Sequence, residues 1–251
     1  MPFLLLISTA FRTQKDYIDN PGGLPRSFTF ANLTSAWSGA NLGSAVLSTL
    51  ITCVVACVLC AVVALAGGFW FRIHGGRAAA WLKWMLVACY AIPEVAWLIP
   101  VFVTLSQVGL TNSRVVTGAI DGVSTLPFAF YLVHTYLRQA LTSDLLEAAT
   151  LDGASVLRTF TTIAVPIARP VLASVVALVF VWTFGDLLIA ATLLQNPSVN
   201  TLTLATAFLS TRENVNLQGQ AAAGLVALLP TLVVFLGAQK ALARGFGASA
   251  A

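Results

Sequence analysis

The sequence predicts an all-α membrane protein of about six transmembrane helices, with one semi-polar helix-turn-helix segment on its cytoplasmic side. Of the 251 residues, 58% are hydrophobic and only 9% are charged, whereas about a quarter of the residues of a soluble domain are charged. A large core cannot explain this deficit, because a soluble protein of this size must cover its surface with polar groups. Long apolar stretches also recur along the chain, separated by polar ones. The surrounding solvent is therefore mostly lipid.

The apolar stretches define the expected spans. A spanning helix needs about 20 mostly apolar residues. Five segments meet this requirement, at roughly 43–69, 84–108, 114–137, 170–194 and 220–241. A sixth and first segment, residues 3–11, is apolar but about half long enough. We therefore expect either a true start further upstream or a truncated first helix that reaches only half-way across the bilayer.

The distribution of Lys and Arg predicts the orientation, because short cytoplasmic loops carry an excess of both. If the basic turn at 70–80 is cytoplasmic, alternation of the spans places 139–168 and the C-terminal tail on the same side. Eight of the 13 basic residues then lie on the cytoplasmic side. No repeat or domain boundary is visible, so residues 1–251 are expected to form a single membrane domain that includes 139–168 as a cytoplasmic loop.

The cytoplasmic segment has the pattern of two short helices joined by a turn. Asp144 is expected to cap the first helix, with Glu147 completing an arrangement like a capping box. Gly153 can take the left-handed conformation that ends a helix. Ser155 can start the second helix, and Pro166 is expected to end it. Such an elbow favours docking into a groove on a partner. The alternative is a solvated loop whose glycine is only a helix cap.

The stretch EAATLDGASVLRTFTTIAVPIARP, which starts at Glu147, closely resembles the EAA motif of permease subunits in binding-protein-dependent ABC importers. The matching positions are Glu147, Ala148, Ala149, Asp152, Gly153, Ala154, Phe160, Ile163, Pro166 and Pro170. The similarity runs from about residue 3 to the C-terminus, and it is greatest to the shorter permease subunit of maltose-type sugar uptake systems. FVWTFGDLLIA resembles an aromatic-Asn-Asp stretch of that group, with Gly185 where Asn is usual.

This resemblance implies a transport subunit of the bacterial inner membrane that is not itself an enzyme and moves a sugar or sugar derivative into the cell. The implied partners are a sister permease subunit in a heterodimer, two ATPase subunits, an extracytoplasmic solute-binding protein and membrane lipid, without nucleic acid. This chain would hold no cofactor, and Mg-ATP would bind in the ATPase subunits. The residues implied in coupling to an ATPase are Glu147, Ala148, Ala149, Asp152, Gly153, Ala154, Arg158 and Phe160.

Three acidic residues, Glu94, Asp121 and Asp186, fall inside apolar spans. A charge at mid-bilayer costs about 2.5–3.5 kcal/mol on insertion scales, so such residues usually face a cavity or a partner. Aromatic faces beside hydrogen-bonding groups suit a polyhydroxylated solute. Glu94 is expected to share a helical face with the two aromatic residues at i−4 and i+3, and Asp186 lies one turn from a tryptophan. The expected substrate pathway is Tyr90, Glu94, Trp97, Trp182 and Asp186.

Alternatives remain for these acids and for the function. The acids could pair with the sister subunit or sit protonated in the packing, and Asp121 is expected nearer the outer surface. An ABC permease for a cation such as a polyamine would use Glu94 and Asp186 for their charge. A stand-alone secondary transporter is disfavoured, because no matched inverted halves are visible. No HExxH, GxSxG or paired-His pattern is present, and the cysteines at 53, 57 and 60 favour packing, so we expect no catalytic or metal site.

Overall fold

The structure, a computed structural model, describes residues 2–209 and 216–247, and the part of the chain so described is almost entirely helical. The helices are α1 (Pro2–Ala10), α2 (Gln14–Asp19), α3 (Ala31–Gly39), α4 (Leu42–Ile73), α5 (Arg77–Cys89), α6 (Glu94–Gln107), α7 (Arg114–Ala140), α8 (Ser143–Leu151), α9 (Val156–Thr159), α10 (Val165–Gly185), α11 (Leu188–Leu193), α12 (Leu202–Ala207) and α13 (Leu217–Gly247). A π-helical turn (Phe160–Ala164) joins α9 to α10, and a 3-10 turn (Pro197–Val199) follows α11. The predicted all-α fold class is confirmed.

Four helices of the described residues are long and apolar enough to cross a membrane: α4, α7, Val156–Gly185 and Leu217–Val234. The bent pair Ala79–Cys89 and Glu94–Gln107 adds a fifth if it is one broken span. The short α1, with nine residues, is about half a span. The spans predicted at 43–69, 114–137 and 220–241 are confirmed, and the total is close to the six expected.

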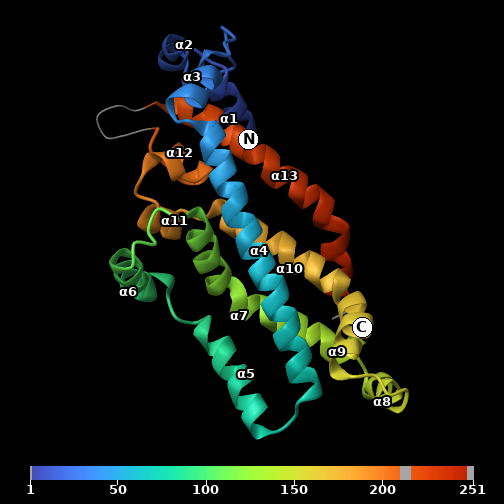
Figure 1. The fold of residues 1–251 in the computed structure, drawn as a ribbon. Helices are drawn as coiled ribbons and strands as arrows, with labels where there is room; N and C mark the ends of the chain where they lie inside the picture. Colours follow the sequence, from blue (N-terminus) through green and yellow to red (C-terminus); the bar gives the residue numbers. More distant parts are fainter. Residues whose placement is uncertain (1, 210–215, 248–251) are drawn as a thin grey trace.

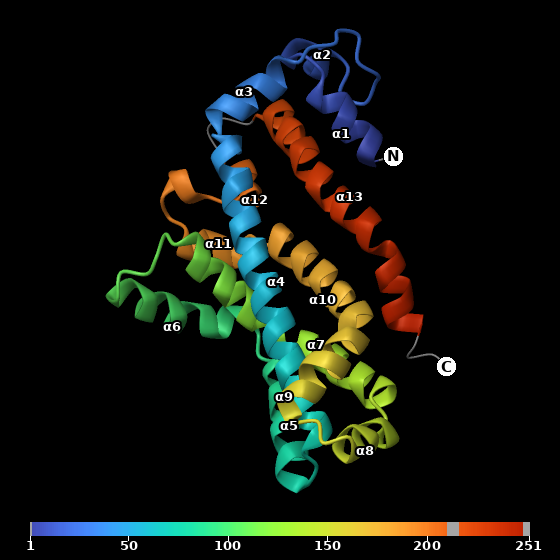
Figure 2. The same ribbon diagram turned by 45° about the vertical axis from the view of Figure 1, so that its right-hand side comes forward.

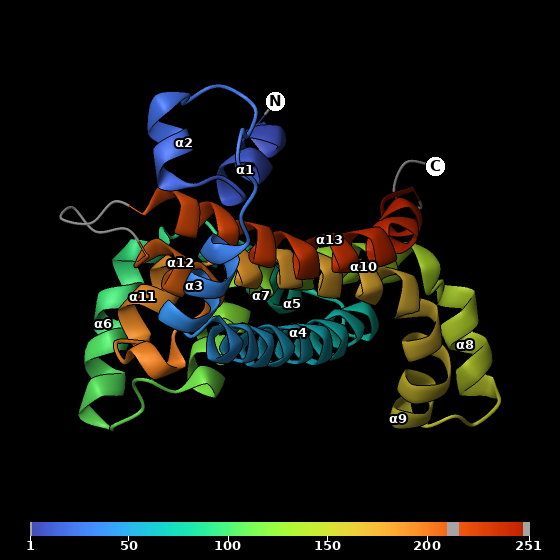
Figure 3. The ribbon, with the colours of Figure 1, turned by 90° about the horizontal axis from the view of Figure 1, so that it is seen from above.

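The long helices pack around α4, which runs through the bundle (Figure 1). On it pack α7 and α10, and α13 lies along α10 on the side away from α7 (Figures 2 and 3). One apolar core joins α4, α7 and α10 and includes Phe69, Val133 and Val175. The three cysteines of α4 are buried within the bundle, and their thiols lie 3.0–3.9 Å from backbone carbonyl oxygens of α7 or α10.

Small residues let α4 and α7 approach closely. A Cβ atom at Gly118 would lie 2.5 Å from the backbone oxygen of Thr52, and one at Gly122 would lie 3.1 Å from the Cα atom of Ala56. Membrane helices associate through such close backbone contact, since lipid tails give no hydrophobic drive between them. Gly118 and Gly122 are therefore the positions that allow the backbones of α4 and α7 to come into contact.

The span predicted over 84–108 is not one continuous helix, because it is divided between α5 and α6. The chain turns at Tyr90–Ile92, where backbone N–H groups donate to carbonyls three residues earlier, and Pro93 then caps a new helix. The two halves meet at 90°. A proline supplies no N–H and restricts the residue before it, so helices often end there.

The span predicted at 170–194 has the wrong limits. It begins at Val156 and ends at Gly185, and Asp186 then separates it from the short α11. Pro166 does not end a helix, as the sequence suggested, because it sits in the first turn of α10, directly after the π-helical turn. A π turn already departs from the α-helical hydrogen-bond pattern, so the missing N–H of a nearby proline costs little there.

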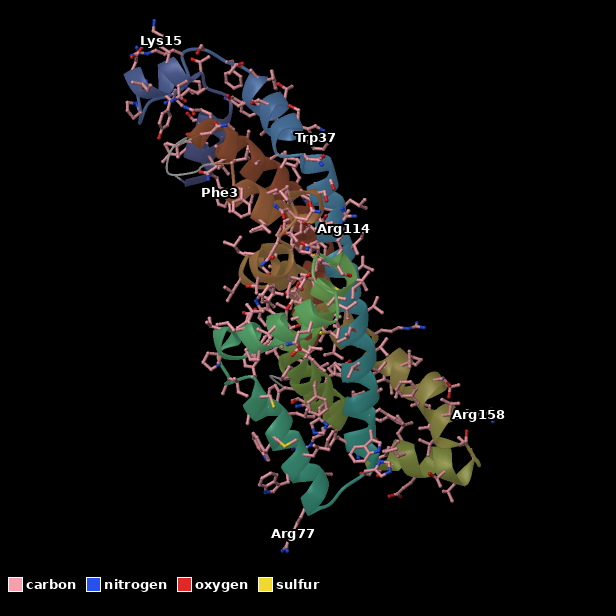
Figure 4. All side chains as sticks on the ribbon, turned by 60° about the vertical axis from the view of Figure 1, so that its left-hand side comes forward. Phe3, Lys15, Trp37, Arg77, Arg114 and Arg158 are labelled. Atoms are coloured by element: carbon pink, nitrogen blue, oxygen red, sulfur yellow. The ribbon has the colours of Figure 1, made fainter. Side chains whose placement is uncertain are left out.

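The elbow and the basic turn at 70–80 lie at one end of the molecule. Figure 4 places Arg77 and Arg158 away from Lys15, which is at the opposite end. A hydrogen bond of 2.7 Å also joins Nε of Arg72 to the backbone oxygen of Leu141, just before α8. The geometry therefore agrees with the assignment of both segments to one side of the membrane.

Candidate functional site

Two places on the molecule gather the residues singled out from the sequence: the elbow at α8 and α9, and a cavity within the bundle. The elbow has the predicted helix-turn-helix form. Gly153 ends α8 with φ +71°, and the Ser155 side chain accepts from the backbone N–H of Arg158 to cap α9. The first cap was predicted wrongly. The side chain of Thr142, not that of Asp144, accepts the N–H of Leu145, because α8 begins two residues earlier than expected.

The elbow is held to the bundle by its inner face. The ring of Phe160 packs at 5.2 Å from that of Phe69 on α4, while Ala149 and Thr159 are buried. Phe160 is therefore an anchor that fixes the elbow relative to α4. The other motif residues expected to meet a partner lie on the outer face, except Ala149 and the half-buried Ala154.

The outer face of the elbow is both apolar and charged. Leu151 is 88% exposed and Leu157 is 71% exposed, so two large apolar side chains have no cover within the chain. From the sequence, Leu157 is expected on an apolar anchor face with Phe160, but its side chain is exposed instead. Exposed apolar side chains that lie together are a signal for contact with a partner. Glu147 lines a cavity of about 570 Å³ together with Arg72 and Leu151. Across residues 2–209 and 216–247, Glu147 makes no ion pair.

The second place is a cavity of about 770 Å³ between the α5–α6 break, α7 and the end of α10. All five residues of the expected pathway line it: Tyr90, Glu94, Trp97, Trp182 and Asp186. The reason given for grouping Tyr90 with Glu94 was wrong, since the two lie on opposite sides of the break and share no helical face. The bend itself brings them to one cavity.

Aromatic side chains line this cavity, and Phe128 packs against two of them. The ring of Trp182 meets that of Phe128 edge-on at 4.9 Å, and Phe128 lies 6.2 Å from Tyr90. Trp182 is 40% exposed and Tyr90 is 53% exposed, so each side chain keeps accessible surface. Flat aromatic faces in a concave site bind the apolar C–H faces of a ring-shaped solute.

Acidic and hydroxyl groups also line this cavity. Asp121 was expected nearer the outer surface, but it is buried at 5% exposure and lines the cavity with Glu94 and Asp186. The buried hydroxyl of Thr183 has no hydrogen-bond partner and belongs to the same lining. Asp121 and Thr183 were missed as site residues, because only the packing of α7 against α10 brings them together.

Asp186 has a structural partner as well as a place in the cavity. Its carboxylate accepts the backbone N–H groups of Ile189 at 3.4 Å and Ala190 at 2.9 Å, and so caps the start of α11. Glu94 and Asp121 make no side-chain hydrogen bond in the described part of the chain, so their carboxyl groups are free to meet a solute. No group of three potential metal ligands occurs among the residues that the structure describes.

The chain is similar to a well-defined group of proteins. A sequence model of the family described as "Binding-protein-dependent transport system inner membrane component" matches residues 62–247. The "Melibiose/raffinose/stachyose import permease protein MelC" of Bacillus subtilis is 28% identical over 100% of this chain and 90% of its own length. The "Diacetylchitobiose uptake system permease protein NgcG" of Streptomyces coelicolor is 27% identical over 97% of this chain and 81% of its own.

The fold also has a solved counterpart. A chain from the crystal structure of a bacterial ABC transporter involved in the import of the acidic polysaccharide alginate superposes with a TM-score of 0.79. The match covers 95% of this chain and 89% of that one, at 18% identity. At that identity the likeness establishes the fold, with its bent and continuous helices, and leaves the solute open.

Proposed function

Because the chain belongs to the family of binding-protein-dependent transport system inner membrane components, we propose that it is the subunit through which an ABC importer admits a sugar or sugar derivative. It is a multi-pass protein of the inner membrane and a transport component rather than an enzyme. The observation that carries the solute class is the 770 Å³ cavity, which is lined by aromatic side chains together with carboxyl and hydroxyl groups. The names of the relatives, which include permeases for melibiose and diacetylchitobiose, support the same class.

The proposed partners follow from the family and from the two sites. A sister permease subunit would complete the pathway on the open side of the cavity. Two ATPase subunits, which would bind Mg-ATP, would receive the elbows of the two permeases through Glu147, Gly153 and Leu151. A solute-binding protein would deliver the solute on the side away from the elbow. Transport needs contacts that differ between two states of this assembly, because only a difference in affinity can shift a conformational equilibrium.

A cationic solute such as a polyamine is the second candidate, and a specific observation favours it. Three carboxyl groups line the cavity, and none of its lining residues is Lys, Arg or His. An ammonium group between carboxylates and tryptophan faces would gain both ion pairing and cation–π attraction.

Replacement of Glu94 tests whether the importer carries a sugar or a polyamine. Glu94→Leu is expected to weaken sugar uptake about two- to tenfold more than Glu94→Gln does, because a net hydrogen bond contributes about 0.5–1.5 kcal/mol and the amide retains it. Uptake by vesicles holding the complete importer would be measured over a range of labelled sugar and labelled polyamine concentrations. Equal losses in the two variants, together with uptake of polyamine in preference to sugar, would show that charge is what the cavity recognises.

Reversal of charge at Glu147 tests the proposed contact with an ATPase. Glu147→Lys is expected to lower association with the ATPase about ten- to hundredfold, since a hydrogen bond to a charged group contributes about 1.5–3 kcal/mol. Copurification of the ATPase from detergent extracts measures this. Asp144→Lys is the matched control, because Asp144 is an exposed acid on the same helix but outside the motif. If the two variants lose the ATPase equally, general surface charge and not Glu147 holds the contact.

A further inference from the structure

A second cavity, of about 380 Å³, lies at the end of the bundle that carries the elbow. It is formed by the end of α4, the start of α5 and the last turns of α7. Five basic or ionisable nitrogen side chains line it: Arg72, His74, Lys83, His134 and Arg138. No acidic side chain is among its lining residues. The proposed transport function uses none of these five residues.

The positive charge in this cavity is largely unneutralised. Lys83 and Arg138 make neither an ion pair nor a side-chain hydrogen bond in the part of the chain that the structure describes. Lys83 lies 5.5 Å from the centre of the Trp84 ring. Arg72 donates to the backbone oxygen of Leu141 and to the hydroxyl of Ser143, and Nδ1 of His74 lies 3.1 Å from the backbone oxygen of Trp70. Cations left without partners at a concave surface attract an anion from outside the chain.

A buried histidine adds an unused polar atom to the same cavity. His134 is 6% exposed, and its ring stacks on Phe130 at a centroid distance of 5.7 Å. Its Nδ1 atom is buried and has no hydrogen-bond partner. Since His134 is among the lining residues, its ring adds a buried ionisable group to the wall of the basic cavity.

The start of α5 faces the cavity too. Gly76 precedes the helix with φ +110°, and no side chain caps the free N–H groups of the first turn. Gly75, Gly76, Ala79 and Ala80 belong to the cavity lining, so the first turn of α5 opens onto it. An uncapped helix start carries partial positive charge and unpaired donors, which suit phosphate oxygens.

An apolar groove continues from the basic cavity along the outer face of α5. The groove has a volume of about 570 Å³ and is lined by Arg77, Trp81, Trp84 and Met85 among others. Trp81 is 75% exposed and Trp84 is 63% exposed. Exposed tryptophans near the end of a membrane helix are typical of the level of the lipid headgroups, where acyl chains begin. A free phosphate ion would leave the groove empty, whereas a phospholipid would fill both parts.

We propose that this cavity binds the phosphate group of an anionic phospholipid of the cytoplasmic leaflet, with an acyl chain in the groove of Trp81, Trp84 and Met85. Basic pockets between membrane helices on the cytoplasmic side bind such headgroups. The lipid would bridge α5 to the end of α7, and α5 leads directly to Tyr90 in the transport cavity. This site does not depend on the identity of the transported solute.

Native mass spectrometry of the purified full chain in neutral detergent tests the proposal. Phosphatidylglycerol is expected to bind with saturation, and phosphatidylcholine with the same acyl chains is expected to bind far more weakly. Lys83→Gln with Arg138→Gln should weaken the binding of phosphatidylglycerol about 25-fold, because each basic residue near an anionic lipid surface contributes about 1 kcal/mol. The control is Lys15→Gln with Arg26→Gln, which removes two exposed charges at the opposite end and should change nothing.

Arg138→Gln alone covers the case in which the double variant does not fold. Arg138 is exposed, and its single replacement should weaken lipid binding about fivefold. Inorganic phosphate is expected to displace the lipid only weakly, because it lacks an acyl chain. Equal binding of the two lipids, equal losses in the Lys83/Arg138 and Lys15/Arg26 variants, or binding of inorganic phosphate without the lipid would each overturn the proposal.

Discussion

Gly118→Val is expected to remove folded protein from the membrane almost completely. A side chain at Gly118 would start 2.5 Å from the backbone oxygen of Thr52 and 2.8 Å from its Cα atom. These are backbone atoms, so relief requires α4 and α7 to separate along their whole interface. Overpacking alone costs about 1–3 kcal/mol, and a backbone obstruction at the main interface is expected to exceed that range. The yield of monodisperse protein in mild detergent and its thermal unfolding midpoint measure the effect.

A matched replacement in another membrane helix provides the control. Gly237 lies in α13, and a Cβ atom there would meet nothing within 4 Å. Gly237→Val adds the same side chain with the same helix propensity, so it should leave the yield and the unfolding midpoint close to those of the parent protein. If Gly118→Val were as stable as Gly237→Val, the close packing of α4 on α7 would not hold the bundle together.

The long spans could be predicted from the sequence because their length and composition are set by the bilayer. α4 and α7 match the predicted segments closely, since an apolar stretch of that length has few other stable forms in lipid. A bend within an apolar segment could not be predicted in this way. Hydropathy is the same for a straight helix and a bent one, so the segment 84–108 gave no sign of its 90° turn.

Proline alone could not have located that turn. Pro100, Pro127, Pro170 and Pro230 all lie inside continuous helices, whereas Pro93 begins one. The difference is tertiary, because a membrane helix tolerates a proline when neighbouring groups satisfy the freed carbonyl. The same reasoning explains Pro166, which was expected to end a helix and instead follows a π-helical turn.

The two candidate sites differ in how far the sequence determines them. The elbow is local, so its turn at Gly153 and the cap at Ser155 could be predicted from residue chemistry. The cavity is assembled from three separate parts of the chain. Glu94 could be identified because an acidic residue is rare in an apolar span, and Trp182 because it lies one turn from the acidic Asp186. The hydroxyl of Thr183 is not distinctive in the sequence, and it was identified only because it is buried without a hydrogen-bond partner in the structure.

Gly153→Val is expected to lower solute uptake by at least about tenfold while the protein remains folded in the membrane. Gly153 has φ +71°, a region in which a β-branched residue is strained by about 1–3 kcal/mol. Among the residues that the structure describes, none lies within 4 Å of a Cβ atom at this position, so the valine clashes with none of them. The loss would come from the turn and from the added bulk, which would hold the elbow away from the proposed ATPase. Uptake by reconstituted vesicles and copurification of the ATPase are measured together.

Gly153→Asn separates the effect of the turn conformation from the effect of the added side chain. Asparagine tolerates the left-handed region, so Gly153→Asn keeps the turn but adds a side chain to the face that would meet the ATPase. Losses in both Gly153 variants would mean that the partner approaches the backbone closely, whereas recovery in Gly153→Asn would mean that the turn alone matters. Gly22→Val is the control, since Gly22 is exposed, has open space around it and lies outside the elbow. Full uptake and full ATPase association in Gly153→Val would contradict the proposed contact and would make the elbow a solvated loop, with Leu151 and Leu157 left exposed.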